Sequence, residues 1–127
     1  MLSRPQTPVA LVAEDEAVIG LFLEQTLADL GFDVLVVASV ADALTVIGSH
    51  PIALALVDYR LRSESAGPVL AALRQRGVPF CVCSGSASED IATGQSGGDF
   101  LAKPFAPGAV EDAIQRLVAR SELPIAV

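Results

Sequence analysis

Short, almost purely apolar runs recur along the chain, and stretches with a helical period separate them. Runs without polar alternation are typical of strands that are covered on both faces, as in a parallel sheet. We expect strands at residues 9–13, 34–37, 53–57, 80–83 and 100–102, and helices at about 17–30, 40–47, 68–76 and 107–120. This alternation predicts an α/β fold with one doubly wound, five-stranded parallel sheet.

One stretch interrupts the pattern, between Ser84 and Lys103. Gly94, Gly97 and Gly98 fall where a fourth helix should lie. Each glycine costs roughly 1 kcal/mol relative to alanine inside a helix. We therefore predict that the fourth helix is short or frayed and is the least stable element of the fold.

Local signals also predict how the first two helices are capped and which residues they bury. Gly31 suits a left-handed cap after helix one, and Ser39 is a good N-cap for helix two. The predicted core stripes are Ile19, Phe22, Leu23, Thr26, Leu27 and Leu30 in helix one, and Val40, Ala43, Leu44 and Ile47 in helix two.

Length and composition fit one folded domain. The chain has 127 residues, of which 52% are apolar and 18% charged. A sizeable core is therefore possible, and a second domain of ordinary size is not. We predict a single domain over residues 1–127, with its core in residues 9–120. The net charge of −7 argues against a nucleic-acid-binding domain, which needs a basic face for phosphates.

The cysteines indicate a reducing compartment. Cys81 and Cys83 lie two residues apart in a predicted strand, where a bridge between them would be strained. We interpret them as reduced, buried thiols of a cytoplasmic protein. Two cysteines and a single histidine exclude a four-cysteine zinc site or a histidine-rich metal site. The apolar runs are too short for a signal peptide or a membrane span, so we expect no membrane partner.

Polar residues with chemical functions gather at the carboxyl ends of the predicted strands. Glu14 and Asp15 follow the first strand, Asp58 the third, Ser84 the fourth and Lys103 the fifth. Ligands of an open parallel sheet bind beyond these ends, so we expect the five side chains to converge. Three carboxylates in one place repel each other, and a hard divalent cation such as Mg²⁺ relieves that repulsion.

These residues predict a magnesium-assisted phosphoryl site. We expect Asp15, Asp58 and the backbone carbonyl of Arg60 to bind Mg²⁺, with Glu14 accepting a hydrogen bond from a metal-bound water. Asp58 can then act as a carboxylate nucleophile towards phosphorus. The lysine and the serine hydroxyl would hold the oxygens of the transferred phosphoryl group.

The motifs that carry these residues resemble those of the receiver (CheY-like) domain of bacterial two-component response regulators. They are Glu14-Asp15-Glu16 after an apolar strand, Val57-Asp58, Ser84-Gly85 and Lys103-Pro104-Phe105, in the expected order within residues 9–120. The resemblance implies a (βα)5, flavodoxin-like fold. It implies Mg²⁺-dependent phosphorylation of Asp58 by a histidine kinase or a histidine phosphotransfer protein. It also implies a cis Lys103-Pro104 bond.

The resemblance and the position of the C-terminus predict how the protein signals. The chain ends soon after Arg120, so we expect a stand-alone receiver that docks on an unidentified downstream protein. Residues 79–85 also resemble the Pro-Phe-x-Phe-Ala-Thr-Gly signature of a subgroup of stand-alone receivers. We expect no enzyme activity beyond acceptance and hydrolysis of its own phosphoryl group. Val18 and Leu21 lie off the core stripe of helix one. They are either scattered surface residues or a docking face for the kinase or phosphotransfer helices.

Three residues depart from the family's usual pattern. Ser84 replaces a threonine, Phe100 takes the place of the switch aromatic, often tyrosine, and Arg62 replaces a frequent proline after Asp58. We predict that Ser84 and Phe100 form the conformational switch. We also predict that Arg60 contacts phosphoryl oxygens at the rim of the pocket and alters the phosphate lifetime.

Other functions compete with this one. An aspartyl-phosphate phosphatase also uses a strand-end aspartate in a Rossmann-like sheet, but it commonly has a second acid two residues later, where Arg60 stands. An FMN-binding protein needs a phosphate loop after the first strand, where Glu14-Asp15-Glu16 would repel phosphate. A scaffold that keeps only the fold would need neither the acids nor the lysine.

Overall fold

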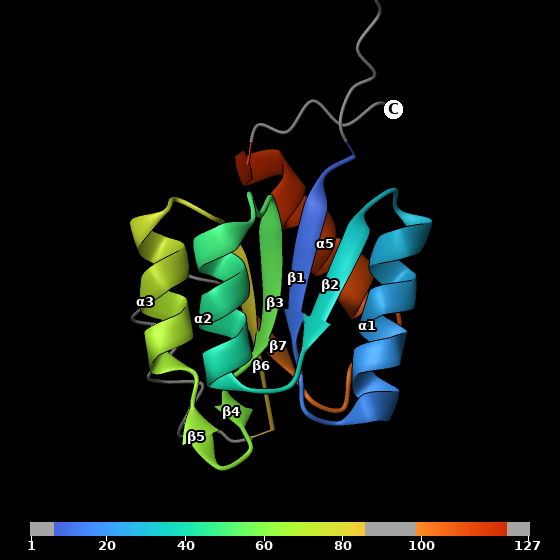
Figure 1. Cartoon of the computed structure of the whole chain (residues 1–127). Coiled ribbons are helices and arrows are strands. Elements are labelled where there is room, and N and C mark those ends of the chain that lie inside the picture. The colour runs from blue at the N-terminus through green and yellow to red at the C-terminus, as the bar shows by residue number, and fades with distance from the viewer. Residues whose placement is uncertain (1–6, 86–98, 122–127) are drawn as a thin grey trace, which may run out of the picture.

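The computed structural model describes residues 7–85 and 99–121. The strands of the main sheet are β1 (Val9–Ala13), β2 (Asp33–Val37), β3 (Leu54–Asp58), β6 (Phe80–Ser84) and β7 (Asp99–Ala102). They are all parallel and lie in the order β2-β1-β3-β6-β7. The helices in these residues are α1 (Ala17–Asp29), α2 (Val40–Ser49), α3 (Gly67–Gln75) and α5 (Ala109–Ser121) (Figure 1). The predicted five-stranded α/β fold is confirmed.

The strands send alternate side chains into two cores, one on each face of the sheet. Ala10 and Val12 of β1 lie in the core covered by α1 and α5. Leu11 and Ala13 lie in the core covered by α2 and α3, which Figure 1 shows side by side on one face. All four residues are completely buried. This burial on both faces explains why the run has no polar alternation.

Several local signals act as predicted. Gly31 follows Leu30, the C-cap of α1, and has a φ of +100°, a conformation that glycine adopts without a steric penalty. The Oγ of Ser39 accepts the N–H of Asp42 at 3.1 Å and caps α2. Cys81 and Cys83 are free and buried, and burial raises the pKa of the Cys81 thiol to about 12.

Two residues that the periodicity assigned to the core are exposed, so those assignments are wrong. Phe22 is 47% exposed and Leu44 is 37% exposed, because each lies at the edge of its helix's apolar stripe. Leu23 and Leu27 cover the sheet instead. Phe22 stacks on Phe105, with ring centroids 6.2 Å apart and ring planes at 23°. The helical period assigns a residue to the apolar side of its helix. It does not tell whether the residue lies at the buried centre of that side or at its exposed edge.

A small antiparallel hairpin between β3 and α3 was not predicted from the sequence. Its strands are β4 (Arg60–Leu61) and β5 (Glu64–Ser65). The two turn residues, Arg62 and Ser63, have φ of 50° and 68°. Two-residue turns with positive φ at both positions usually contain asparagine, aspartate or glycine. Arg-Ser therefore carries no local turn signal.

The predicted fourth helix falls in residues 86–98 and lies outside the described residues. Among the helices that are described, none is both long and apolar enough to cross a membrane.

Candidate functional site

The carboxyl ends of the parallel strands bring the predicted acids together. In the sheet, Ala13 pairs with Val57 and Asp58 pairs with Cys83, so the ends of β1, β3 and β6 are level. Glu14 and Asp15, which follow β1, therefore lie beside Asp58. One carboxylate oxygen from each of the three acids lies within 4.8 Å of the others.

Lys103 joins two of these acids. It directly follows β7, and its Nζ lies 2.8 Å from Oε1 of Glu14 and 2.9 Å from Oδ2 of Asp58. Its backbone N–H donates to the carbonyl of Ser84 at 2.9 Å. Burial alone lowers the pKa of the Lys103 ammonium, but the hydrogen bonds and charges of Glu14 and Asp58 outweigh burial and raise that pKa above its ordinary value. Lys103 is therefore a permanent cation in this site.

Glu14 is the most deeply buried of the three acids, at 3% exposure. Its backbone N–H donates to the carbonyl of Val37 at 2.9 Å, and its Oε2 accepts the N–H of Glu16 at 3.1 Å. Burial raises the pKa of Glu14 to about 7, although the hydrogen bond from Lys103 opposes that rise; the charge of Asp58 adds to it. The site thus contains one carboxyl group that ionises near neutral pH in the absence of a further cation.

The hairpin supplies two backbone donors to the remaining acids. The N–H of Arg60 donates to Oδ1 of Asp58 at 3.2 Å, and the N–H of Arg62 donates to Oδ2 of Asp15 at 2.9 Å. Asp15 itself is exposed, and so is the side chain of Arg60, which lies in β4 at the edge of the site. Sequence reasoning missed these donors because they depend on the unpredicted turn.

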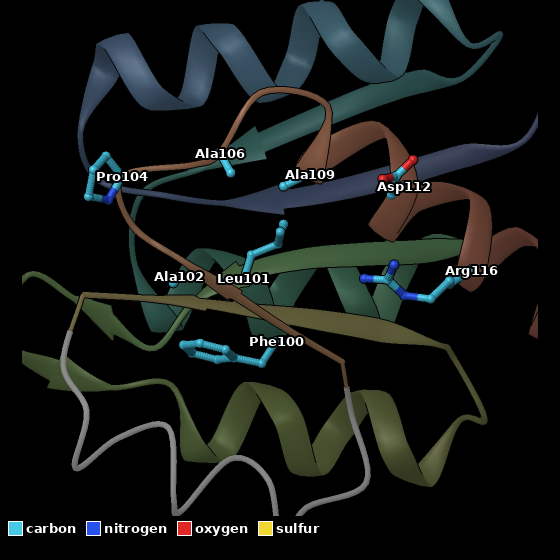
Figure 2. A pocket seen from close by; sticks show the side chains of 8 residues that line it. All are labelled: Phe100, Leu101, Ala102, Pro104, Ala106, Ala109, Asp112 and Arg116. Carbon is cyan, nitrogen blue, oxygen red and sulfur yellow. The ribbon is translucent and has the colours of Figure 1, made fainter.

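The two predicted switch residues lie on neighbouring strands. Ser84 is 2% exposed and ends β6, where it pairs with Ala102 of β7. Phe100 of β7 is half-buried and lines a cavity of about 410 Å³, together with residues of α5 and of the segment that precedes it. Figure 2 shows Phe100 and Leu101 on opposite faces of β7, with Arg116 of α5 further along the cavity.

An apolar patch lies on α1, the helix that begins directly after the acidic segment Glu14–Glu16. Val18 and Leu21, predicted to lie off the core stripe, are 83% and 62% exposed. The stacked pair of Phe22 and Phe105 extends the same side of α1 to the segment after Lys103. We call Val18, Leu21, Phe22 and Phe105 the α1 patch. The peptide bond between Lys103 and Pro104, just before Phe105, is cis, as the resemblance implies.

The donor set fits a hard divalent cation. The acids contribute three carboxylates, and Lys103 forms ion pairs with two of them. Carboxylate oxygens are the protein ligands that Mg²⁺ prefers, with carbonyl groups and waters completing its shell. Thiolate and imidazole ligands, which favour softer metals, are not part of this cluster.

Comparison with known proteins identifies the family. A family model for the response regulator receiver domain matches residues 10–115. The chain belongs to this family. Membership of the receiver family does not favour the alternative that the protein is an aspartyl-phosphate phosphatase. A comparison with curated protein sequences finds no match.

Solved structures of receiver domains share the fold. A receiver protein from Sinorhizobium medicae is 29% identical, with a TM-score of 0.81 over 91% of this chain and 98% of the other. A CheY-like receiver domain protein from Methanospirillum hungatei is 23% identical, with a TM-score of 0.82 over 92% and 98% of the two chains. The receiver domain of a putative LuxO repressor from Vibrio parahaemolyticus is also 23% identical, with a TM-score of 0.81 over 92% and 94%.

Proposed function

We propose that Asp58 is the phosphoryl acceptor of this receiver domain. We also propose that Asp15, Asp58 and the backbone carbonyl of Arg60 would bind Mg²⁺, and that Glu14 would accept a hydrogen bond from a metal-bound water. The proposal depends on one observation, the convergence of the three carboxylates within 4.8 Å at the ends of the strands. When bound, Mg²⁺ offsets the negative charge of the carboxylates and of the incoming phosphoryl oxygens.

Asp58, Lys103 and Ser84 have different roles in the phosphoryl transfer. A carboxylate oxygen of Asp58 forms the new bond to phosphorus while the bond from phosphorus to the donor histidine nitrogen breaks, and the imidazole keeps the electron pair. Lys103, which already contacts Asp58 at 2.9 Å, can donate to a phosphoryl oxygen beside that carboxylate. The Ser84 hydroxyl is the second donor. Positioning and charge neutralisation are most of what phosphoryl transfer requires from a protein.

Phosphorylation would then change the surface through Ser84 and Phe100. In this proposal, Ser84 moves towards the phosphoryl oxygens and Phe100 turns inward. The half-buried position of Phe100 supports this, because its ring still has exposed surface that an inward turn would bury. Such a change shifts an equilibrium between two existing states.

An intact-mass experiment tests the acceptor. The wild-type protein, incubated with Mg²⁺ and a small phosphodonor, should gain one phosphoryl group, and Asp58→Asn should gain none. Asp29→Asn is the matched control, because Asp29 is an exposed aspartate at the end of α1. No gain in the wild type, or an equal gain in Asp58→Asn, would contradict the proposal. Repeated turnover of phosphoesters would instead support the phosphatase alternative.

The α1 patch is the surface that we assign to the donor protein, a histidine kinase or a histidine phosphotransfer protein. Val18, Leu21 and Phe22 of this patch are exposed, Phe105 is half-buried beside Phe22, and α1 begins directly after Glu14–Glu16. Val18→Ser and Leu21→Ser should slow transfer from the protein donor but leave phosphorylation by a small phosphodonor unchanged. Leu44→Ser, at an exposed apolar position on α2, is the control for transfer from the protein donor. Equal rates of that transfer in all variants would contradict this assignment.

The remaining predictions stay proposals. We expect a cytoplasmic protein whose residues 1–127 form one receiver domain and which signals by contact with a downstream protein, without nucleic-acid or membrane partners. Its only chemistry would be acceptance and hydrolysis of its own phosphoryl group. The Arg60 side chain would alter the rate of that hydrolysis. An unchanged rate in Arg60→Ala would contradict the role of Arg60.

A further inference from the structure

The turn of the β4–β5 hairpin is strained. Arg62 and Ser63 have φ of 50° and 68°, and a residue with a Cβ pays roughly 1–2 kcal/mol in this left-handed region. Strain of this kind persists only where the surrounding structure imposes it. Leu61, next to the turn, is fully buried, and the N–H of Ala66 donates to the carbonyl of Tyr59 at 2.7 Å across the base of the hairpin. The hairpin is therefore anchored on both sides of its turn.

The strained turn aims a backbone donor at an acid that is distant in sequence. The N–H of Arg62 lies 2.9 Å from Oδ2 of Asp15, 47 residues away. Asp15 is exposed, so packing does not restrict its carboxylate, and this hydrogen bond is a specific restraint on it. The Arg62 side chain is itself exposed. The contact that Arg62 makes with Asp15 is through its backbone N–H. A proline here would have no N–H to donate.

We propose that the backbone N–H of Arg62 is a positioning group for the magnesium site, which holds the Asp15 carboxylate beside Asp58 before the cation binds. This inference rests on the proposed function, because it takes Asp15 as a Mg²⁺ ligand. The neighbouring donor supports it: the N–H of Arg60 contacts Oδ1 of Asp58 at 3.2 Å, so one hairpin restrains both acids. Loss of a group that orients a metal ligand typically weakens metal affinity by about 10–100-fold.

An amide-to-ester exchange at residue 62 removes the N–H and keeps the side chain. Cys81 offers a ligation junction, so a synthetic segment 1–80 that carries the ester can be joined to residues 81–127. The same exchange at Ser63 is the matched control, and Arg62→Gly removes the side chain but keeps the N–H. Calorimetric titration with MgCl₂ measures each dissociation constant. Tyr59 fluorescence is a second signal, because the chain has one tyrosine and no tryptophan.

We expect the ester at 62 to weaken Mg²⁺ binding by about 10-fold or more, and the Ser63 ester and Arg62→Gly to stay within about threefold of the wild type. An unchanged affinity in the 62 ester would overturn the inference alone. So would an equal loss in Arg62→Gly, because the side chain would then be responsible. A wild-type protein that binds no Mg²⁺ would overturn the proposed function as well.

Amide exchange on the unaltered protein gives a test that does not depend on folding of the ester. The Arg62 amide should exchange more slowly than it does in Asp15→Ala, and it should stay protected when Mg²⁺ saturates the protein. An Arg62 amide that exchanges equally fast in the wild type and in Asp15→Ala, or that loses its protection with Mg²⁺, would overturn the inference.

Discussion

Glu14 should make the metal-free protein less stable as the pH rises. Burial raises the pKa of Glu14 from 4.5 to about 7. Between pH 4.5 and about pH 7, Glu14 has lost its carboxyl proton in the unfolded chain but keeps it in the folded protein. The folded state then binds more protons, so the free energy of unfolding falls as the pH rises through this window. At about 1.4 kcal/mol for each pKa unit between the two states, the full loss is about 3.5 kcal/mol. The raised pKa of Lys103 affects stability only above its ordinary value of 10.5.

Urea titrations without Mg²⁺, followed by circular dichroism at about pH 5 and about pH 7.5, measure this loss. Glu14→Gln should remove most of the difference between the two pH values, because glutamine does not ionise. Glu111→Gln should keep it, because Glu111 is an exposed residue in the first turn of α5. A wild-type protein that is equally or more stable at the higher pH would refute the reasoning. An unchanged pH difference in Glu14→Gln would do the same.

Three further outcomes follow from the structure. Leu61→Ala should cost about 2–5 kcal/mol of unfolding free energy because Leu61 is fully buried. Leu44→Ala should cost about 1 kcal/mol or less, because Leu44 is 37% exposed. Equal losses of the two variants in urea titrations would contradict this difference in burial. Saturating Mg²⁺ should raise the urea midpoint of the wild type more than that of Asp15→Asn, and equal increases would argue against Asp15 as a ligand. Cys81 and Cys83 should react with a thiol reagent at neutral pH only after unfolding, and a fast reaction of the native protein would contradict their burial.

The amino-acid sequence by itself was enough to predict the sheet and the place of the acids. Strands that are buried on both faces must be apolar throughout, so β1 and β3 are visible as runs of apolar residues. Because parallel strands share one carboxyl edge, the residues after those runs were expected to meet there. Glu14, Asp15 and Asp58 do lie within 4.8 Å of one another. Their roles with Mg²⁺ and phosphate remain predictions.

Only the tertiary structure decided the contacts that join distant segments. Phe22 was assigned to the core from its helical period, yet it stacks on Phe105 at the surface. The N–H of Arg62 reaches Asp15 because Leu61 is buried and anchors the hairpin. Arginine and serine are not typical residues of such a turn, so the sequence does not predict this geometry. The raised pKa of Glu14 likewise follows from its burial. The hydrophobic period and the order of the strands can be read from neighbouring residues in the sequence. Burial, ring stacking and the direction of a hydrogen bond between distant residues depend on which surfaces pack against each other.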